Sequence, residues 1–193
     1  MSSLAEREKL LLLQIARSAL TLAVTGKPPL QDFPAEEFLQ QAAGAFVTLH
    51  RRGRLRGCVG QLPGCDSLAA VVAHCARAAA LEDSRFELVI SAELSEIDIE
   101  VSVLSALEDV TLEAIVAGKH GLVVSQSRQR GVLLPQVATQ FNWQPRRFLE
   151  ETCVKAGLER YAWKDSATRV QAFTADVFSE AAFPVMPRNV QSG

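Results

Sequence analysis

The segment of this sequence best suited to chemistry places a thiol between two glycines with arginines beside it, Arg54-Leu55-Arg56-Gly57-Cys58-Val59-Gly60. Arginine recognises planar anions, glycine lets a ligand or another backbone approach closely, and nearby cations lower the pKa of a thiol. Cys58 is therefore a candidate nucleophile and Arg56 a candidate anion-binding residue. Gly57 and Gly60 are candidate substrate contacts. The structural alternative, which general frequencies favour, is a twisted strand with a small packed cysteine and solvated arginines.

Four further titratable residues lie at the ends or on the polar faces of expected elements. Asp83 and Arg85 follow an expected helix, where they could brace a turn through local hydrogen bonds and a charge pair. The functional alternative brings Arg85 into a cleft near Cys58. His120 lies in an expected turn and Glu100 on the polar face of an expected strand, so both are candidates for proton transfer. Such residues are nevertheless more often structural or solvated.

The remaining cysteines and the arginine cluster give weaker signals. The three other cysteines are Cys65, Cys75 and Cys153. No two cysteines form a CxxC pair, and we interpret these three as structural thiols. Cys58, His120 and Cys153 match no compact zinc motif, so neither a metal nor another cofactor is expected. The four arginines within positions 51–56 are a weak nucleic-acid signal, because no aromatic residues are interleaved with them.

The composition is that of an ordinary globular protein. The chain has 193 residues, about one domain with room for a small second lobe. Hydrophobic residues make up 48% and charged residues 22%, which argues against disorder, and the net charge of −2 does not suit wholesale coating of nucleic acid or an anionic membrane. No window is apolar enough to span a membrane and no export signal is visible, so we expect a cytoplasmic protein.

The elements that must position these residues are helices interspersed with hairpins. Helices are expected over 4–24, 34–39, 67–81, 111–117, 135–141 and 145–156, and strands over 44–50, 55–59, 97–103, 122–125, 131–134 and 170–178. Asp66 or Ser67 is the expected cap of the third helix, and glycines 57 and 60 are expected to mark a bulge or a close backbone approach. Hairpins between helices favour an α+β fold with a mainly antiparallel sheet packed with helices.

Six motifs, in order along residues 5–180, resemble the AMMECR domain family. They are Leu55–Gly60 (LRGC[IV]G), Asp83–Phe86 (DSRF), Ile99–Ser105 ([IV]EVS[VL]L[ST]), Lys119–Leu122 (the HG turn), Gly131–Ala138 (LLPQVA) and Thr152–Leu158 (TCxKAGL). One departure is Glu82, where many relatives have a histidine. A scheme that needs a histidine before the DSRF motif is therefore in doubt.

The resemblance implies an α+β fold in which a larger and a smaller lobe flank a cleft near the LRGC[IV]G motif. We therefore expect one two-lobed domain over residues 5–183, followed by an irregular tail over 184–193. Prokaryotic family members are often described as protein A of the AmmeMemoRadiSam system, and their genes can accompany those of a Memo-like protein and a radical SAM protein. No activity is securely assigned to the family.

Two functions from different classes remain open. In the first, the protein is an enzyme or enzyme component that uses this cleft, with a small anionic ligand and with Memo-like and radical SAM partners. Its candidate catalytic residues are Cys58, His120 and Glu100, and its candidate substrate-binding residues are Arg56, Gly57, Gly60, Asp83 and Arg85. In the second, it is a non-catalytic scaffold that presents the LRGCVG surface to such partners. We expect Arg56, Cys58, Arg85, Glu100 and His120 to line one concave surface.

Overall fold

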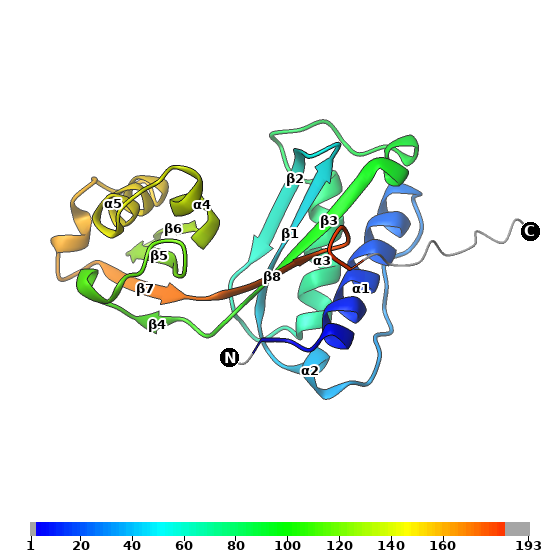
Figure 1. Ribbon diagram of the computed structural model, residues 1–193, viewed down its shortest axis with the longest axis horizontal. Coiled ribbons are helices and arrows are strands. Elements are labelled where there is room, and N and C mark those ends of the chain that lie inside the picture. The colour runs from blue at the N-terminus through cyan, green and yellow to red at the C-terminus, as the bar shows by residue number, and fades with distance from the viewer. Residues whose placement is uncertain (1–2, 184–193) are drawn as a thin grey trace, which may run out of the picture. The chain divides into compact units, whose positions relative to one another are not determined.

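The computed structural model describes residues 3–183, which form two compact units with one four-stranded sheet each (Figure 1). Unit 1 is built from two parts of the chain, residues up to Val103 and residues from Asp176. Unit 2 is the continuous segment Leu104–Ala175 between them. Antiparallel sheets packed with helices confirm the expected α+β class. The tail expected over 184–193 lies outside the described residues.

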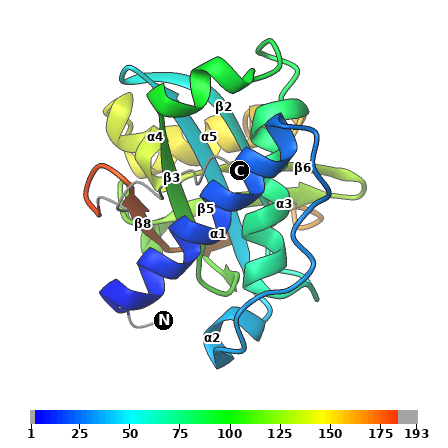
Figure 2. The same ribbon diagram turned by 90° about the vertical axis from the view of Figure 1, so that its right-hand side faces the viewer.

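Unit 1 contains three α-helices, a 3-10 helix and four strands within the described residues. In chain order these are α1 (Glu6–Val24), α2 (Glu37–Gln40), β1 (Gly44–Arg51), β2 (Arg54–Gln61), α3 (Leu68–Leu81), the 3-10 helix η1 (Ser91–Glu96), β3 (Ile97–Leu104) and β8 (Ala175–Ser179). The strand order in the sheet is β2-β1-β3-β8. Helices α1 and α3 lie side by side against this sheet (Figure 2).

Strand alternation explains how this sheet is covered. Val47 and Leu49 of β1 and Ile99 and Val101 of β3 are buried in one core with the apolar residues of α1 and α3. Because successive strand residues point to opposite faces, the intervening polar residues lie on the face away from these helices. Helix α3 begins as expected, since the hydroxyl of Ser67 accepts a hydrogen bond from the Ala70 amide at 3.4 Å.

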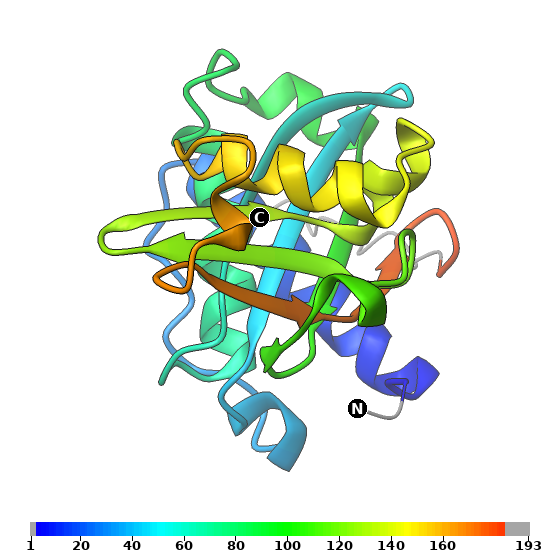
Figure 3. The same cartoon turned by 90° about the vertical axis from the view of Figure 1, so that its left-hand side faces the viewer.

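Unit 2 has its own sheet, helices and core. Its elements are β4 (Glu108–Asp109), the 3-10 helix η2 (Leu112–Ala114), β5 (Gly121–Gln126), β6 (Gln129–Leu133), α4 (Pro135–Gln140), α5 (Pro145–Lys155), the 3-10 helix η3 (Ala162–Lys164) and β7 (Arg169–Phe173), with strand order β4-β7-β5-β6. Helix α5 lies across the β5–β6 hairpin (Figure 3). It buries Phe148, Leu149 and Cys153, the face expected from their spacing.

The prediction of one continuous strand over residues 170–178 is wrong. It divides at Thr174 into β7 and β8, which belong to different sheets. At the division, the Ser105 amide donates to the Thr174 carbonyl oxygen at 2.9 Å, and the Thr174 amide donates to the Ser105 hydroxyl at 3.0 Å. Strand-forming residues such as Val170, Phe173 and Val177 stand on both sides of Thr174, so the sequence does not reveal that the strand changes its pairing partners.

Two expected helices are also shorter than predicted. Over 34–39, the helix begins only at Glu37, because Glu36 has an extended backbone. The helix ends at Gln40. The carbonyl oxygen of the next residue, Gln41, accepts a hydrogen bond from the Leu68 amide at the start of α3. Over 111–117 only the three residues of η2 are helical. Among residues 3–183, no helix is both long enough and apolar enough to cross a membrane.

Candidate functional site around Cys58

The β1–β2 hairpin places Cys58 on the face of the unit 1 sheet that α1 and α3 do not cover. Cys58 pairs across the strands with Thr48, and cross-strand neighbours project to the same face. The register shifts between Leu49, opposite Gly57, and His50, opposite Leu55. Arg56 is therefore the extra residue of a bulge, and the expected irregularity lies immediately before Gly57.

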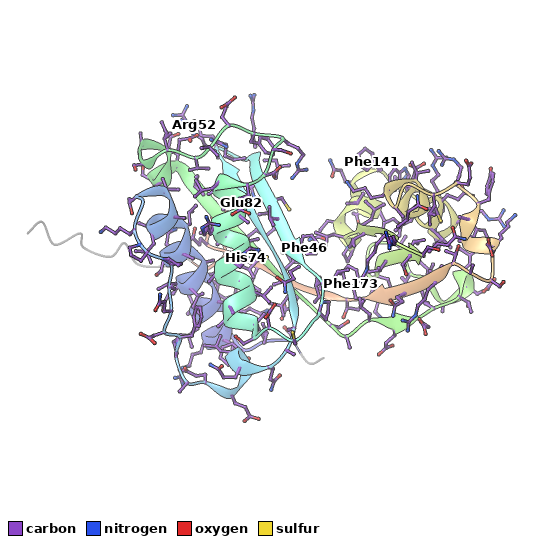
Figure 4. The ribbon with its side chains drawn as sticks, turned by 180° about the vertical axis from the view of Figure 1, so that it is seen from behind. Phe46, Arg52, His74, Glu82, Phe141 and Phe173 are labelled. Carbon is purple, nitrogen blue, oxygen red and sulfur yellow. The ribbon has the colours of Figure 1, made fainter. Side chains whose placement is uncertain are left out.

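Packing accounts for both glycines of the motif. A Cβ atom on Gly57 would overlap the carbonyl oxygen of Ala79 in α3, so the absence of a side chain lets β2 approach that helix closely. A Cβ atom on Gly60 would overlap the ring of its cross-strand partner Phe46, which is labelled in Figure 4. Ala79 and Phe46 therefore occupy the space beside these glycines where a ligand was expected to approach. Substrate binding by Gly57 and Gly60 stays a prediction.

Hydrogen bonds hold Cys58 at its backbone and at its sulfur. Its amide donates to the Asp83 carboxylate at 2.8 Å, and its carbonyl oxygen accepts from the Arg85 guanidinium at 3.2 Å. Its Sγ atom accepts from the Thr48 hydroxyl at 3.3 Å. The side chain itself is half-buried. The thiol is therefore fixed in position and has a hydroxyl donor aimed at its sulfur.

Asp83 and Arg85 brace their turn, as expected, and both also contact the backbone of Cys58, while the entry of Arg85 into a cleft stays a prediction. Within their turn, the Asp83 carboxylate accepts from the amide and the guanidinium of Arg85, and the two side chains form an ion pair at 2.6 Å. Together they also bond the edge strand β2 at Cys58, where a neighbouring strand would otherwise bond it. Hydrogen bonds from Arg85 and from the Cys58 amide lower the pKa of Asp83 to about 2 against the opposing effect of burial. Asp83 is therefore ionised at neutral pH.

The guanidinium of Arg56 is engaged inside unit 1. It donates to both oxygens of Glu93, at 3.0 and 2.9 Å, and to the carbonyl oxygens of Glu87 and Leu88. Arg51 bonds the same Glu93 carboxylate at 2.7 Å. Hydrogen bonding from Arg56 is the largest of the effects that lower the pKa of Glu93 to about 2. Anion binding by Arg56, which stays a prediction, would compete with this carboxylate.

Three of the four arginines in the cluster thus pair with two glutamates of η1. Arg51 and Arg52 both pair with Glu96, at 2.6 and 2.5 Å, and Arg51 also pairs with Glu93. A surface cavity of about 530 Å³ lies beside this network. Its lining includes Arg51, Arg56 and two strongly exposed apolar residues, Leu88 and Ile90.

Glu100 and His120, the two candidates for proton transfer, belong to different units. Glu100 alternates with the buried Ile99 and Val101, so it shares the face of Cys58 in unit 1. Strand β1 lies between their strands, which puts the two backbones about 10 Å apart at the usual strand spacing. His120 lies in unit 2, where it stays a predicted site residue.

The ring of His120 is held by the turn that precedes β5. Its Nδ1 atom accepts a hydrogen bond from the Val116 amide at 3.2 Å, so in the neutral ring the proton is on Nε2. Burial and the nearby Lys119 lower the pKa of His120, outweighing the opposing effect of Glu108. The imidazole is therefore neutral at physiological pH and has its Nε2 proton available to donate.

The other thiols differ from Cys58 in their surroundings. Burial raises the pKa of Cys75 to about 12 and also raises the pKa of Cys153, as expected for packed thiols. Cys65 is exposed, so packing does not account for it. Within residues 3–183, no group of three or more His, Cys, Asp or Glu side chains is arranged to hold a metal ion.

The model of the family described as AMMECR1 matches residues 13–178. The chain belongs to the AMMECR1 family. A protein of Methanothermobacter thermautotrophicus is 40% identical over 179 residues, covering 88% of this chain and 92% of its own length. One from Aquifex aeolicus is 33% identical over 177 residues, covering 88% of this chain and 91% of its own.

A solved structure supports the fold of this AMMECR1-family chain. The crystal structure of an uncharacterized protein from Pyrococcus horikoshii matches with a TM-score of 0.79 and 36% sequence identity. The match covers 89% of this chain and 90% of the other. The family membership expected from the six motifs is therefore confirmed.

Two residues of the candidate site around Cys58 were not predicted from the sequence. Thr48 bonds the sulfur of Cys58, and Glu93 bonds Arg51 and Arg56. The sequence does contain a signal for Thr48. It is a polar residue in an otherwise apolar strand, and it lies across the expected hairpin from Cys58. No local signal marked Glu93, since its partners lie about 40 positions earlier in the chain.

Proposed function

We propose that this AMMECR1-family protein is an enzyme, or a component of an enzyme, whose reacting group is the thiol of Cys58. The observation that supports this most is the constraint on that one residue. Its amide donates to Asp83, its carbonyl oxygen accepts from Arg85, and its sulfur accepts a hydrogen bond from Thr48. A hydroxyl donor stabilises a thiolate, the form of cysteine that acts as a nucleophile.

The surrounding residues suggest separate roles in this proposal. Arg85 is 57% exposed, and its Nη1 atom bonds no residue within the described chain, so it is the guanidinium best placed to contact a small anionic substrate. Arg56 instead braces the bulge through Glu93. Glu100 would receive the thiol proton through water or substrate, because the strand spacing keeps it from direct contact with Cys58.

The family resemblance supports the finer part of the proposal. In that reading the chain is protein A of the AmmeMemoRadiSam system, acting in the cytoplasm with a Memo-like protein and a radical SAM protein. The comparisons support family membership, and the named relatives add no activity.

Thiol labelling tests the role of Cys58. We expect limited iodoacetamide treatment, read by mass spectrometry, to modify Cys58 faster than the more exposed Cys65. Replacing Thr48 with valine removes the hydroxyl donor with little change in shape, so it should slow labelling of Cys58. The control Thr25→Val, at the exposed end of α1, should leave the labelling rate unchanged. Faster labelling of Cys65 than Cys58, or no effect of Thr48→Val, would reject the proposal.

A second function, docking of a partner protein, is favoured by apolar side chains beside Arg56. Leu88 and Ile90, which line the cavity beside Arg56, are 61% and 60% exposed. Large exposed apolar residues grouped in this way are typical of protein interaction sites. If the protein is a scaffold, Leu88→Asp with Ile90→Asp should abolish co-purification with a Memo-like protein from the same genome. If the protein is a scaffold, Cys58→Ser should leave this co-purification intact. If the protein is an enzyme or enzyme component, Cys58→Ser should instead abolish turnover by the assembled system.

A further inference from the structure

Unit 2 contains a second cavity that the proposed function does not use. It has a volume of about 440 Å³, within the range of roughly 300–1,000 Å³ that is typical of small-molecule sites. It is formed between the turn at 115–118 and the connection from α4 to α5. Its lining residues are all uncharged, and they include Ala117, Thr139, Asn142, Trp143 and Gln144.

The polar side chains of this cavity are unused by the protein. Thr139, Asn142 and Gln144 are exposed, and within residues 3–183 their side chains make no hydrogen bond to another protein group. An amide side chain carries a donor and an acceptor side by side. Asn142 and Gln144 therefore offer two such pairs from either side of Trp143.

The segment that presents these amides is rigidly built. Asn142 has φ of 51°, a left-handed conformation that asparagine tolerates better than most residues. The amides of Asn142 and Trp143 donate to the carbonyl oxygens of Thr139 and Ala138, at 3.2 and 2.9 Å. The ring of Trp143 stacks on that of Phe141, labelled in Figure 4, with centroids 4.8 Å apart and planes at 18°. Trp143, the aromatic residue of the lining, is thus held in place by a backbone hydrogen bond and by stacking on Phe141.

We propose that this cavity binds the base of a purine nucleoside or nucleotide. A purine presents adjacent donors and acceptors on a planar aromatic ring, and asparagine and glutamine pair with such an edge in a bidentate manner. The uncharged lining suits a neutral ring. The inference is independent of the proposed role of Cys58.

Calorimetric titration of the full chain with three probes tests this proposal. Adenosine, AMP and ribose 5-phosphate separate the contributions of base, sugar and phosphate. We expect saturable binding of adenosine and AMP and much weaker binding of ribose 5-phosphate. In a Trp163→Phe variant, Trp143 is the remaining tryptophan, so adenosine should also change the fluorescence. Equal binding of ribose 5-phosphate and AMP, or no binding of adenosine, would overturn the proposal.

Three substitutions localise the site. Asn142→Gly removes one amide while keeping a residue that adopts the left-handed backbone, and Gln144→Ala removes the other from an exposed position. Each should weaken adenosine binding by about fivefold or more, the discrimination expected of a bidentate pair. The control Gln140→Ala, in α4 but outside the lining, should change it less than about twofold. If Asn142→Gly unfolds, Gln144→Ala still decides, since unchanged binding by that variant contradicts the site.

Discussion

Gly57 shows how the absence of one side chain fixes a strand against a helix. Gly57→Ala would drive a Cβ atom into the backbone carbonyl of Ala79, and a backbone atom cannot move aside as a flexible side chain can. We expect this substitution to lower the free energy of unfolding by about 1–3 kcal/mol or more, measured by urea denaturation. Gly64→Ala is the matched control, since its nearest neighbour would be 4.0 Å away, and it should change stability by less than about 0.5 kcal/mol. Equal effects of the two would contradict this account of the motif.

Glu93 makes the stability of unit 1 sensitive to acid. The pKa of its carboxyl group is about 2 in the folded protein, against an ordinary value of 4.5, so folding favours the ionised form. The stabilisation is complete above pH about 4.5 and is lost as the pH falls toward about 2. For this buried carboxylate we expect a contribution on the order of 2 kcal/mol.

The variant Glu93→Gln isolates that contribution. Its free energy of unfolding should be lower at neutral pH and should depend less on pH between about 4.5 and 2 than that of the wild type. The control Glu37→Gln alters an exposed carboxylate in α2 and should leave the difference between these pH values unchanged. Parallel pH curves for Glu93→Gln and the wild type would show that the network with Arg51 and Arg56 does not stabilise the fold.

At the scale of elements, β8 is attached to unit 1 by an ion pair with α1. Arg17 of α1 bonds the Glu180 carboxylate and also donates to the carbonyl oxygens of Leu94 and Ile97. The same carboxylate accepts from the Ile99 amide at 3.0 Å. One residue just after β8 therefore joins that strand to α1 and β3.

Removing Glu180 should therefore cost more than losing one surface charge. We expect Glu180→Ala to lower the free energy of unfolding by about 3–5 kcal/mol, because the Ile99 amide loses its acceptor and Arg17 keeps its carbonyl contacts but loses its counter-charge. Thermal or urea unfolding measures the change, and Glu37→Ala serves as the control at an exposed position. A loss below about 1 kcal/mol would place this pair among ordinary surface ion pairs.

At the scale of the whole molecule, unit 2 is a continuous insertion between two strands of unit 1. Segment 104–175 carries its own sheet, two helices and a separate core that includes Leu122, Phe148 and Leu149. Unit 1, in contrast, needs both parts of the chain, because β8 completes its sheet.

This organisation predicts that residues 104–175 fold when expressed alone. A segment of this size is near the lower limit for an independent core, so we expect modest stability but a cooperative thermal transition and a mixed helix and strand circular dichroism spectrum. Leu149→Ala, which opens a cavity in the isolated core, should abolish or strongly lower that transition, whereas Val154→Ala, at an exposed position on α5, should not. A non-cooperative wild-type segment would show that unit 2 depends on the rest of the chain.

The sequence by itself determined the family, the fold class and most elements of this protein. Six ordered motifs sufficed for the family, and local periodicity sufficed for α1, α3, α5 and the two hairpins, because the spacing of apolar residues is set by the backbone geometry of a single element. It also singled out Asp83 and Arg85 and predicted that they would brace their own turn, since that contact spans two positions.

Only the tertiary structure decided how these pieces are used. It showed that β7 and β8 join different sheets, that the Asp83–Arg85 turn also bonds the backbone of Cys58, and that Arg56 is paired with Glu93. Each of these facts depends on contacts between residues 25 or more positions apart. Such contacts are set by the packing of whole elements, which leaves no periodic trace in the residues that make them.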